Sequence, residues 1–170
     1  AGVLSNTFVL ETRLEWTGTG VEIRQQLAET YNSERRNKII CADATVLNYE
    51  KELDALNAPN TIDYLQVDID PPSNSYKALV AVLRGSRRFS LITFEHDLYR
   101  RRFKFLPVNY YWKWKALLLL RSRGYVCMAS NVANGRARQE DWYASKSMNF
   151  EKIRLPRSVD FRTVFQNYPK

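Results

Sequence analysis

IDYLQVDIDPP at residues 62–72 and RFSLITFEHD at residues 88–97 are two short apolar runs that decide the fold. Near-continuous runs of this length are typical of strands that are covered on both faces of a parallel sheet. The residues between them, SYKALVAVL at 75–83, repeat their apolar positions with helical spacing. The stretch therefore predicts a strand, a helix and a second strand that lies parallel to the first.

The same alternation of short strands and helices extends over most of the chain. Further strands are predicted at Gly18–Ile23, Lys38–Asp43 and Tyr125–Val132, and further helices at 6–15, 24–33, 48–56 and 111–123. Gly124 is predicted to end the last helix in a left-handed conformation. NGRARQED (134–141) is predicted as a turn, after which DWYAS (141–145) returns as one antiparallel strand. This pattern indicates an α/β fold.

Composition places the chain among ordinary globular domains. It has 170 residues, of which 45% are hydrophobic, so we expect one domain over residues 1–170. Its longest aliphatic run, Ala116–Leu120, is far shorter than the roughly 20 residues that span a bilayer. Cys41 and Cys127 lie within apolar runs and are predicted as buried free thiols, which favours a reducing, cytoplasmic location.

Basic residues are concentrated in one segment. The formal net charge is +8, yet residues 1–60 contain six Lys and Arg against nine Asp and Glu. Residues 77–123 contain twelve basic residues and only two acidic ones. Aromatic residues alternate with the basic ones over 99–114, a composition that suits either sugar rings or a nucleic-acid groove. The segment predicts an anionic partner, unless it is a solvated helix face with aromatics packed in the core.

Four successive predicted strands end in acidic residues. These residues are Glu22, Asp43, Asp68 with Asp70, and Glu95 with Asp97. In an open parallel sheet, ligands bind at the carboxyl ends of the strands, so the carboxylates should converge on one rim. A carboxylate can accept two hydrogen bonds from a ribose diol. The alternative is that each residue caps the helix that follows it.

Several segments, taken in order, resemble a known family. They are SNTFVLETRLEWTGTGVEI (5–23), CADAT (41–45), IDYLQVDIDPP (62–72), RFSLITFEHDLYR (88–100), GYVCMASNV (124–132) and EDWY (140–143). Together they are similar to the FkbM-type S-adenosylmethionine-dependent methyltransferases over about residues 2–145. The resemblance implies a class I methyltransferase fold, a Rossmann-like three-layer sandwich with a mostly parallel sheet. It also implies O-methylation, often of sugar hydroxyls in glycans or glycosylated products.

The resemblance assigns cofactor contacts to particular residues. Asp68 would lie below the sulfonium of S-adenosylmethionine, and Glu22 would hold the ribose. Asp43 with Ala44 would contact the adenine. The methionine part would lie along Gly2, Ser5, Asn6 and Thr7.

The chain departs from the family pattern at its start. The family's first strand would precede Ala1, in the middle of the sheet between the strands that end at Glu22 and Asp68. We therefore expect two unpaired strand edges there, and a chain that is part of a longer polypeptide. The alternative is that another segment fills the gap. EDWYAS (140–145) is a candidate, although the family places that strand near the other edge of the sheet.

O-methylation of a sugar requires a group that accepts the hydroxyl proton. His96 is the only histidine, and its ordinary pKa near 6.5 suits a general base. The alternative is a structural histidine held by a hydrogen bond. The carboxylates Asp68, Asp70, Glu95 and Asp97 offer a second route, because they could also bind Mg²⁺.

Two further classes of function stay open at this point. A nucleic-acid methyltransferase or binding module would explain the basic segment, although an Asn-Pro-Pro-Tyr-type motif is absent from the sequence. A domain without catalysis, serving as an interaction module of a larger polypeptide, would explain the missing strand. Cofactor binding separates the enzyme from the interaction module.

Overall fold

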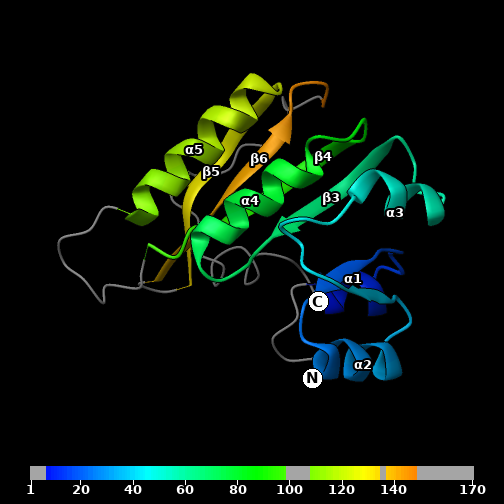
Figure 1. Ribbon diagram of the computed structural model, residues 1–170. Coiled ribbons are helices and arrows are strands. Elements are labelled where there is room, and N and C mark those ends of the chain that lie inside the picture. Colours follow the sequence, from blue (N-terminus) through cyan, green and yellow to red (C-terminus); the bar gives the residue numbers. More distant parts are fainter. Residues whose placement is uncertain (1–6, 99–107, 135–136, 149–170) are drawn as a thin grey trace. The chain divides into compact units, whose positions relative to one another are not determined.

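The computed structural model describes residues 7–98, 108–134 and 137–148, and the chain divides into two compact units (Figure 1). Unit one spans residues 1–47 and unit two spans residues 48–170. Within the described residues, no helix has the length and the apolar character needed to cross a bilayer.

Unit one contains a small parallel sheet. Its elements are α1 (Phe8–Thr12), β1 (Gly20–Glu22), α2 (Gln25–Glu34) and β2 (Ile39–Cys41). β1 pairs with β2 in parallel, with Glu22 opposite Cys41. The buried Glu11 joins α1 to the turn before β2, because its carboxylate accepts hydrogen bonds from the backbone nitrogens of Arg36 and Asn37 at 2.7 and 3.0 Å.

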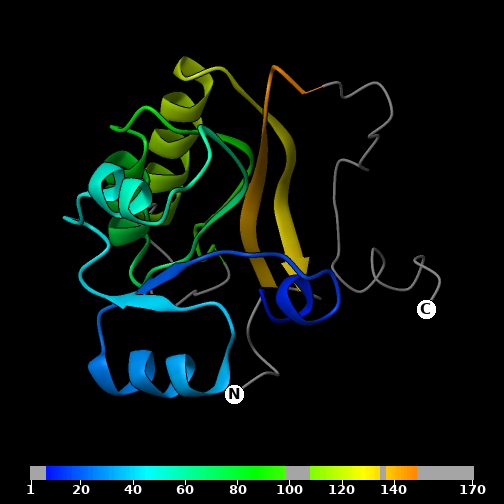
Figure 2. The ribbon, with the colours of Figure 1, turned by 90° about the vertical axis from the view of Figure 1, so that its right-hand side faces the viewer.

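Unit two is a four-stranded sheet with helices. Its elements are α3 (Tyr49–Ala55), β3 (Thr61–Val67), α4 (Pro72–Val82), β4 (Arg88–Glu95), α5 (Val108–Ser122), β5 (Tyr125–Asn134) and β6 (Ala137–Ser145). The strand order is β3-β4-β6-β5. β3 and β4 are parallel, and β6 is antiparallel to both of its neighbours. α4 and α5 lie side by side on one face of this sheet (Figures 1 and 2).

The core of unit two lies between these helices and the sheet. Its fully buried side chains come from both layers: Leu79 of α4, Ala116 and Leu120 of α5, Ile92 and Phe94 of β4, Val132 of β5 and Tyr143 of β6. Burial of each large apolar side chain contributes roughly 1.5–3 kcal/mol. This packing fixes the strand ends that the next section describes.

Most predicted elements are confirmed, with shifted ends. α4 begins at Pro72 instead of Ser75, because the fixed φ of proline suits the first turn of a helix. The hydroxyl of Ser75 also bonds the backbone of Ile69, accepting from its nitrogen at 2.8 Å and donating to its oxygen at 2.9 Å. Gly124 has the predicted left-handed conformation, with φ of 86°.

The predicted turn over residues 134–141 is wrong in its extent. β5 continues to Asn134 and β6 begins at Ala137, so the polar residues 137–141 belong to a strand. They can do so because β6 has a partner on each side, with Glu140 opposite both Glu95 and Val132. Ladder hydrogen bonds on both edges outweigh the turn-forming composition.

The assignment of residues 140–145 to the gap beside β3 is also wrong. β6 lies between β4 and β5, where the family pattern would place it. A short connection forces this, because Asn134 and Ala137 are already opposite each other in the β5–β6 pair. Among the described residues, β1 pairs only with β2 and β3 only with β4, which agrees with the expected gap.

The two thiols differ from their predicted burial. Both cysteines are free, but Cys41 is exposed and Cys127 is half-buried. Cys41 ends the short strand β2 of a two-stranded sheet, which offers little cover for its side chain. Burial raises the pKa of Cys127 to about 11, so this thiol is protonated at neutral pH.

Candidate functional site

The acidic residues of unit two gather where β3 and β4 end. β3 ends at Val67, so Asp68 and Asp70 follow it in the loop to α4. β4 ends at Glu95, and Asp97 follows with a left-handed φ of 52°. Because β3 and β4 are parallel neighbours, both loops emerge on the same edge of the sheet. The predicted convergence is therefore confirmed for this pair of strands.

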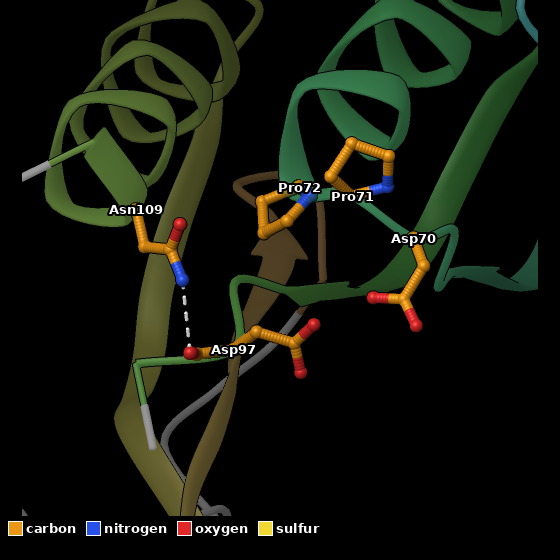
Figure 3. A pocket seen from close by; sticks show the side chains of 5 residues that line it. All are labelled: Asp70, Pro71, Pro72, Asp97 and Asn109. Atoms are coloured by element: carbon orange, nitrogen blue, oxygen red, sulfur yellow. Dashed lines mark hydrogen bonds between the residues drawn. The ribbon is translucent and has the colours of Figure 1, made fainter. Parts of the chain in front are cut away.

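A cavity of about 440 Å³ opens between these loops and the start of α5. It is lined by Asp70, Pro71, Pro72, Asp97 and Asn109 (Figure 3). In this view, the carboxylate of Asp97 extends toward that of Asp70. Asn109 donates a 3.0 Å hydrogen bond from its amide to the backbone oxygen of Asp97, which joins α5 to the end of β4. The cavity thus combines two carboxylates with a rigid proline wall.

Glu95 carries a proton at neutral pH. Burial, together with the neighbouring carboxylates of Asp68 and Asp97, raises the pKa of Glu95 to about 10. A third negative charge beside two carboxylates is unfavourable, whereas a protonated carboxyl can donate a hydrogen bond to one of them. Glu95 therefore limits the negative charge at this edge of the sheet.

Replacing Glu95 with glutamine should change how stability depends on pH. Because the folded-state pKa is raised, the contribution of Glu95 is fully present below the unfolded value of 4.5 and is lost as pH rises through about 10. We expect Glu95→Gln to match the wild type near pH 4 and to exceed its free energy of unfolding at pH 9. The difference in free energy of unfolding between the variant and the wild type should grow by at most about 1.4 kcal/mol per pH unit.

Urea titrations of both proteins across this pH range measure the difference. Glu34→Gln is the matched control, because Glu34 is exposed on α2. The free energy of unfolding is measured at steps of about one pH unit from pH 5 to 9. If the difference between Glu95→Gln and the wild type does not grow over this range, the pKa of Glu95 is not raised.

His96 is a buried member of a hydrogen-bond network. Its side chain is fully buried, and Nε2 lies 3.3 Å from Oδ1 of Asp141 on β6. Burial lowers the pKa of His96, although Asp141 opposes the shift. His96 is not among the residues that line the cavity. Its role as general base stays a prediction, and its surroundings favour the structural alternative.

Asp141 organises that network, although it was not among the residues predicted for the site. Its Oδ1 accepts hydrogen bonds from Lys113 Nζ at 2.6 Å, Ser130 Oγ at 2.9 Å and the backbone nitrogen of Asn131 at 2.8 Å. Tyr143 donates its hydroxyl to Oδ2 at 3.1 Å. Burial raises the pKa of Asp141, but hydrogen bonding from His96 and the charge of Lys113 outweigh burial and hold it well below its ordinary value.

Glu22 in unit one meets the chemical requirement for holding a ribose. Hydrogen bonding from Arg24 lowers the pKa of Glu22, so its carboxylate is ionised. Arg24 supplies three donors to this carboxylate, at 2.9, 3.0 and 3.3 Å. A carboxylate has roughly four acceptor positions, so a diol must displace part of this contact. The Arg24 side chain is 70% exposed, which makes the exchange inexpensive.

The other predicted cofactor residues are only partly described. Oδ1 of Asp43 accepts hydrogen bonds from the backbone nitrogen and the hydroxyl of Thr45, at 2.8 and 2.7 Å. Ala44 is half-buried beside it, and Thr7 precedes α1. Gly2, Ser5 and Asn6 lie outside the described residues. Their predicted contacts with the cofactor, and that of Asp68, stay predictions.

The predicted magnesium site is not supported. In the part of the chain that the structure describes, no group of three or more His, Cys, Asp or Glu side chains is arranged to hold a metal ion.

The comparison with solved structures finds the same arrangement of elements in a known enzyme. The crystal structure of Schizosaccharomyces pombe Dnmt2 methyltransferase superposes with a TM-score of 0.52 and 18% identity over 86% of this chain. The fold is that of the class I methyltransferases. A DNMT2 mutant from Spodoptera frugiperda aligns with a TM-score of 0.48 and 15% identity over 89% of this chain.

The match is one of architecture only. This chain spans 44% of the S. pombe protein and 47% of the S. frugiperda protein. No family model matches the sequence, and no curated protein matches it.

Proposed function

We propose that this chain is the catalytic part of an S-adenosylmethionine-dependent methyltransferase of the FkbM type, which methylates a sugar hydroxyl of a glycan or glycosylated product. The observation that carries the proposal is the cavity containing Asp70 and Asp97 at the carboxyl ends of β3 and β4. In open α/β sheets, this edge is where ligands bind.

The proposed cofactor contacts are those that the family resemblance assigns to each residue. Glu22 would accept hydrogen bonds from the ribose hydroxyls, Asp43 and Ala44 would contact the adenine, and Asp68 would lie near the sulfonium. When bound, the cofactor supplies an electrophilic methyl group. The residues Gly2, Ser5, Asn6 and Thr7 complete this proposed set.

Asp97 is the residue that we propose as the proton acceptor. Its side chain is 3% exposed yet lines the cavity, so an acceptor hydroxyl there would meet a carboxylate shielded from water. A positioned base contributes typically 10²–10⁴-fold to rate. Asp70 would hold a second hydroxyl, and the Pro71–Pro72 wall would orient the sugar ring. Alignment of this kind lowers the barrier further.

A nucleic-acid substrate is the second candidate. The observation that favours it is the charge of the two helices beside the cavity, since α4 and α5 contain Lys77, Lys113, Lys115 and Arg121 and no acidic residue. The third candidate, an interaction module without catalysis, is favoured by the unpaired edges of β1 and β3.

Cofactor-induced stabilisation tests the proposed function. At a hundredfold excess over Kd, S-adenosylmethionine or its demethylated product should raise the free energy of unfolding by about 2.7 kcal/mol. Glu22→Ala should weaken this effect, while Glu34→Ala, an exposed glutamate of the same unit, should not. The proposal fails if neither compound shifts the melting temperature of the wild type.

Transfer of labelled methyl groups to separate glycan and RNA pools identifies the substrate class. Label in the glycan pool supports the sugar assignment. Label only in RNA replaces it with the second candidate.

A further inference from the structure

The outward side of α5 is an exposed apolar and aromatic surface. We call it the α5 surface, and its members are Tyr110, Tyr111, Trp114 and Leu118, which are 50, 54, 55 and 61% exposed. Single exposed apolar residues are common on proteins, but four on one helix are not. The core does not explain them, because the buried residues of this helix, Ala116 and Leu120, belong to its other side.

Helical spacing makes the α5 surface continuous. Tyr110, Trp114 and Leu118 follow one another at intervals of four residues, so they form a line along the helix with roughly 6 Å between neighbours. Tyr111 lies three residues before Trp114 and seven before Leu118, which places it beside the same line. Two tyrosines and a tryptophan are therefore exposed on one side of the helix.

A lysine is held at the border of these rings. The ammonium of Lys115 lies 4.8 Å from the ring centre of Tyr76, 5.4 Å from that of Tyr111 and 5.5 Å from that of Trp112. Contacts of this kind between a cation and a ring contribute roughly 0.5–1 kcal/mol at exposed sites. They keep a positive charge at a fixed position next to the exposed rings.

The charged residues of α4 and α5 all have the same sign. α4 and α5 contain four basic residues and no acidic one. Lys113 is engaged with the buried Asp141, but Lys115 and Arg121 border the α5 surface. The positive charge favours an anionic partner. The exposed rings favour a partner that also carries flat apolar groups.

We propose that the α5 surface binds single-stranded nucleic acid. Unpaired bases would stack on Tyr110, Tyr111 and Trp114, and the phosphates would lie near Lys115 and Arg121. Any base can stack on an aromatic ring, so the surface needs no particular sequence. Duplexes would bind more weakly, because their bases are already stacked. The proposal does not depend on methyl transfer.

The arrangement of charges distinguishes this partner from a membrane surface. An interfacial helix places its apolar residues on one face and its basic residues on the opposite, polar face. On α5 the opposite face packs into the core through Ala116 and Leu120, and Lys115 lies at the border of the rings, 5.4 Å from the ring centre of Tyr111. Exposed rings with cations at their border match the bases and the phosphates of a single strand.

Fluorescence anisotropy with a labelled oligouridylate of about 12 nucleotides tests the proposal. The double variant Tyr110→Ala/Trp114→Ala should bind at least tenfold more weakly than the wild type, since each stacked base contributes about 1–3 kcal/mol and 1.4 kcal/mol is tenfold. Lys115→Gln should reduce the slope of log affinity against log salt by about 0.7.

Trp16→Ala is the matched control, because Trp16 is a 40% exposed tryptophan of unit one. It should leave oligouridylate affinity unchanged. Thermal melts establish that the variants are folded.

The proposal is overturned if the wild type does not bind oligouridylate at low salt, or if the double variant binds as tightly as the wild type. Binding to phosphatidylserine vesicles that is lost in the double variant, with no loss of oligouridylate binding, also overturns it in favour of a membrane surface. If S-adenosylmethionine does not bind, the proposed function is refuted, but the test of oligouridylate binding is unaffected.

Discussion

Asp141→Ala should lower the free energy of unfolding by about 3–5 kcal/mol, the loss that follows removal of one partner from a buried ion pair. The side chains of Asp141 and Lys113 are 2% and 12% exposed. Without the carboxylate, the ammonium of Lys113 keeps hydrogen bonds to Ser130 and Asn131, at 2.8 and 3.0 Å, but loses the negative charge beside it. A buried ammonium without a counterion lowers the free energy of unfolding, because the surrounding atoms do not solvate the charge as water would.

Three substitutions separate the charge from the hydrogen bonds. Asp141→Asn keeps an acceptor oxygen and should be less destabilising than Asp141→Ala. Tyr143→Phe removes only the hydroxyl that bonds Oδ2 and should cost about 1 kcal/mol. Asp63→Ala, an exposed aspartate on β3, is the control and should change stability by less than about 0.5 kcal/mol. Urea denaturation measures all four variants.

The role assigned to Asp141 is wrong if Asp141→Ala and Asp63→Ala have equal effects. If Asp141→Ala does not fold, the stabilities of Asp141→Asn and Tyr143→Phe still show how much the charge and one hydrogen bond contribute. Equal stability of Asp141→Asn and wild type would show that the negative charge contributes nothing.

The acidic edge of unit two could be predicted from the sequence because it follows from a local rule. Alternating strands and helices imply parallel strands, and parallel strands place their carboxyl ends together. Four acidic residues lie at or just after the ends of these strands: Asp68, Asp70, Glu95 and Asp97. Their position could therefore be predicted without knowledge of distant contacts. The edge of β3 without a partner among the described residues was expected from the family resemblance and not from a local rule.

The network around His96 could not be predicted, because its partners are distant in the sequence. His96 and Asp141 are 45 residues apart, and Lys113 is 28 residues from Asp141. Only the pairing of β4 with β6 brings them together. From the sequence alone, a histidine at a strand end is a candidate general base. The pairing with β6 shows that His96 is buried beside Asp141. No local signal marked Asp141, because it directly follows the polar residues Arg138, Gln139 and Glu140 in β6.

Substituting Asp97 and His96 in turn should distinguish the group that accepts the proton from the group that supports the fold. If Asp97 is the base, Asp97→Asn should lower kcat by about 10²–10⁴-fold, because the amide cannot accept the hydroxyl proton. Cofactor-induced stabilisation should persist, since Asp97 is not in the proposed cofactor set. His96→Ala should instead lower the melting temperature, because it empties a fully buried position and removes a partner of Asp141.

Single-turnover rates, measured with labelled cofactor well below each melting temperature, provide the comparison. A His96→Ala protein that remains folded and binds cofactor normally, yet transfers no methyl group, would make His96 the base after all. The burial of His96 argues against that outcome, because a proton taken from a substrate must reach a nitrogen that the sheet encloses. Asp97 differs from His96 in this respect: it is equally shielded from bulk water, but it lines the cavity.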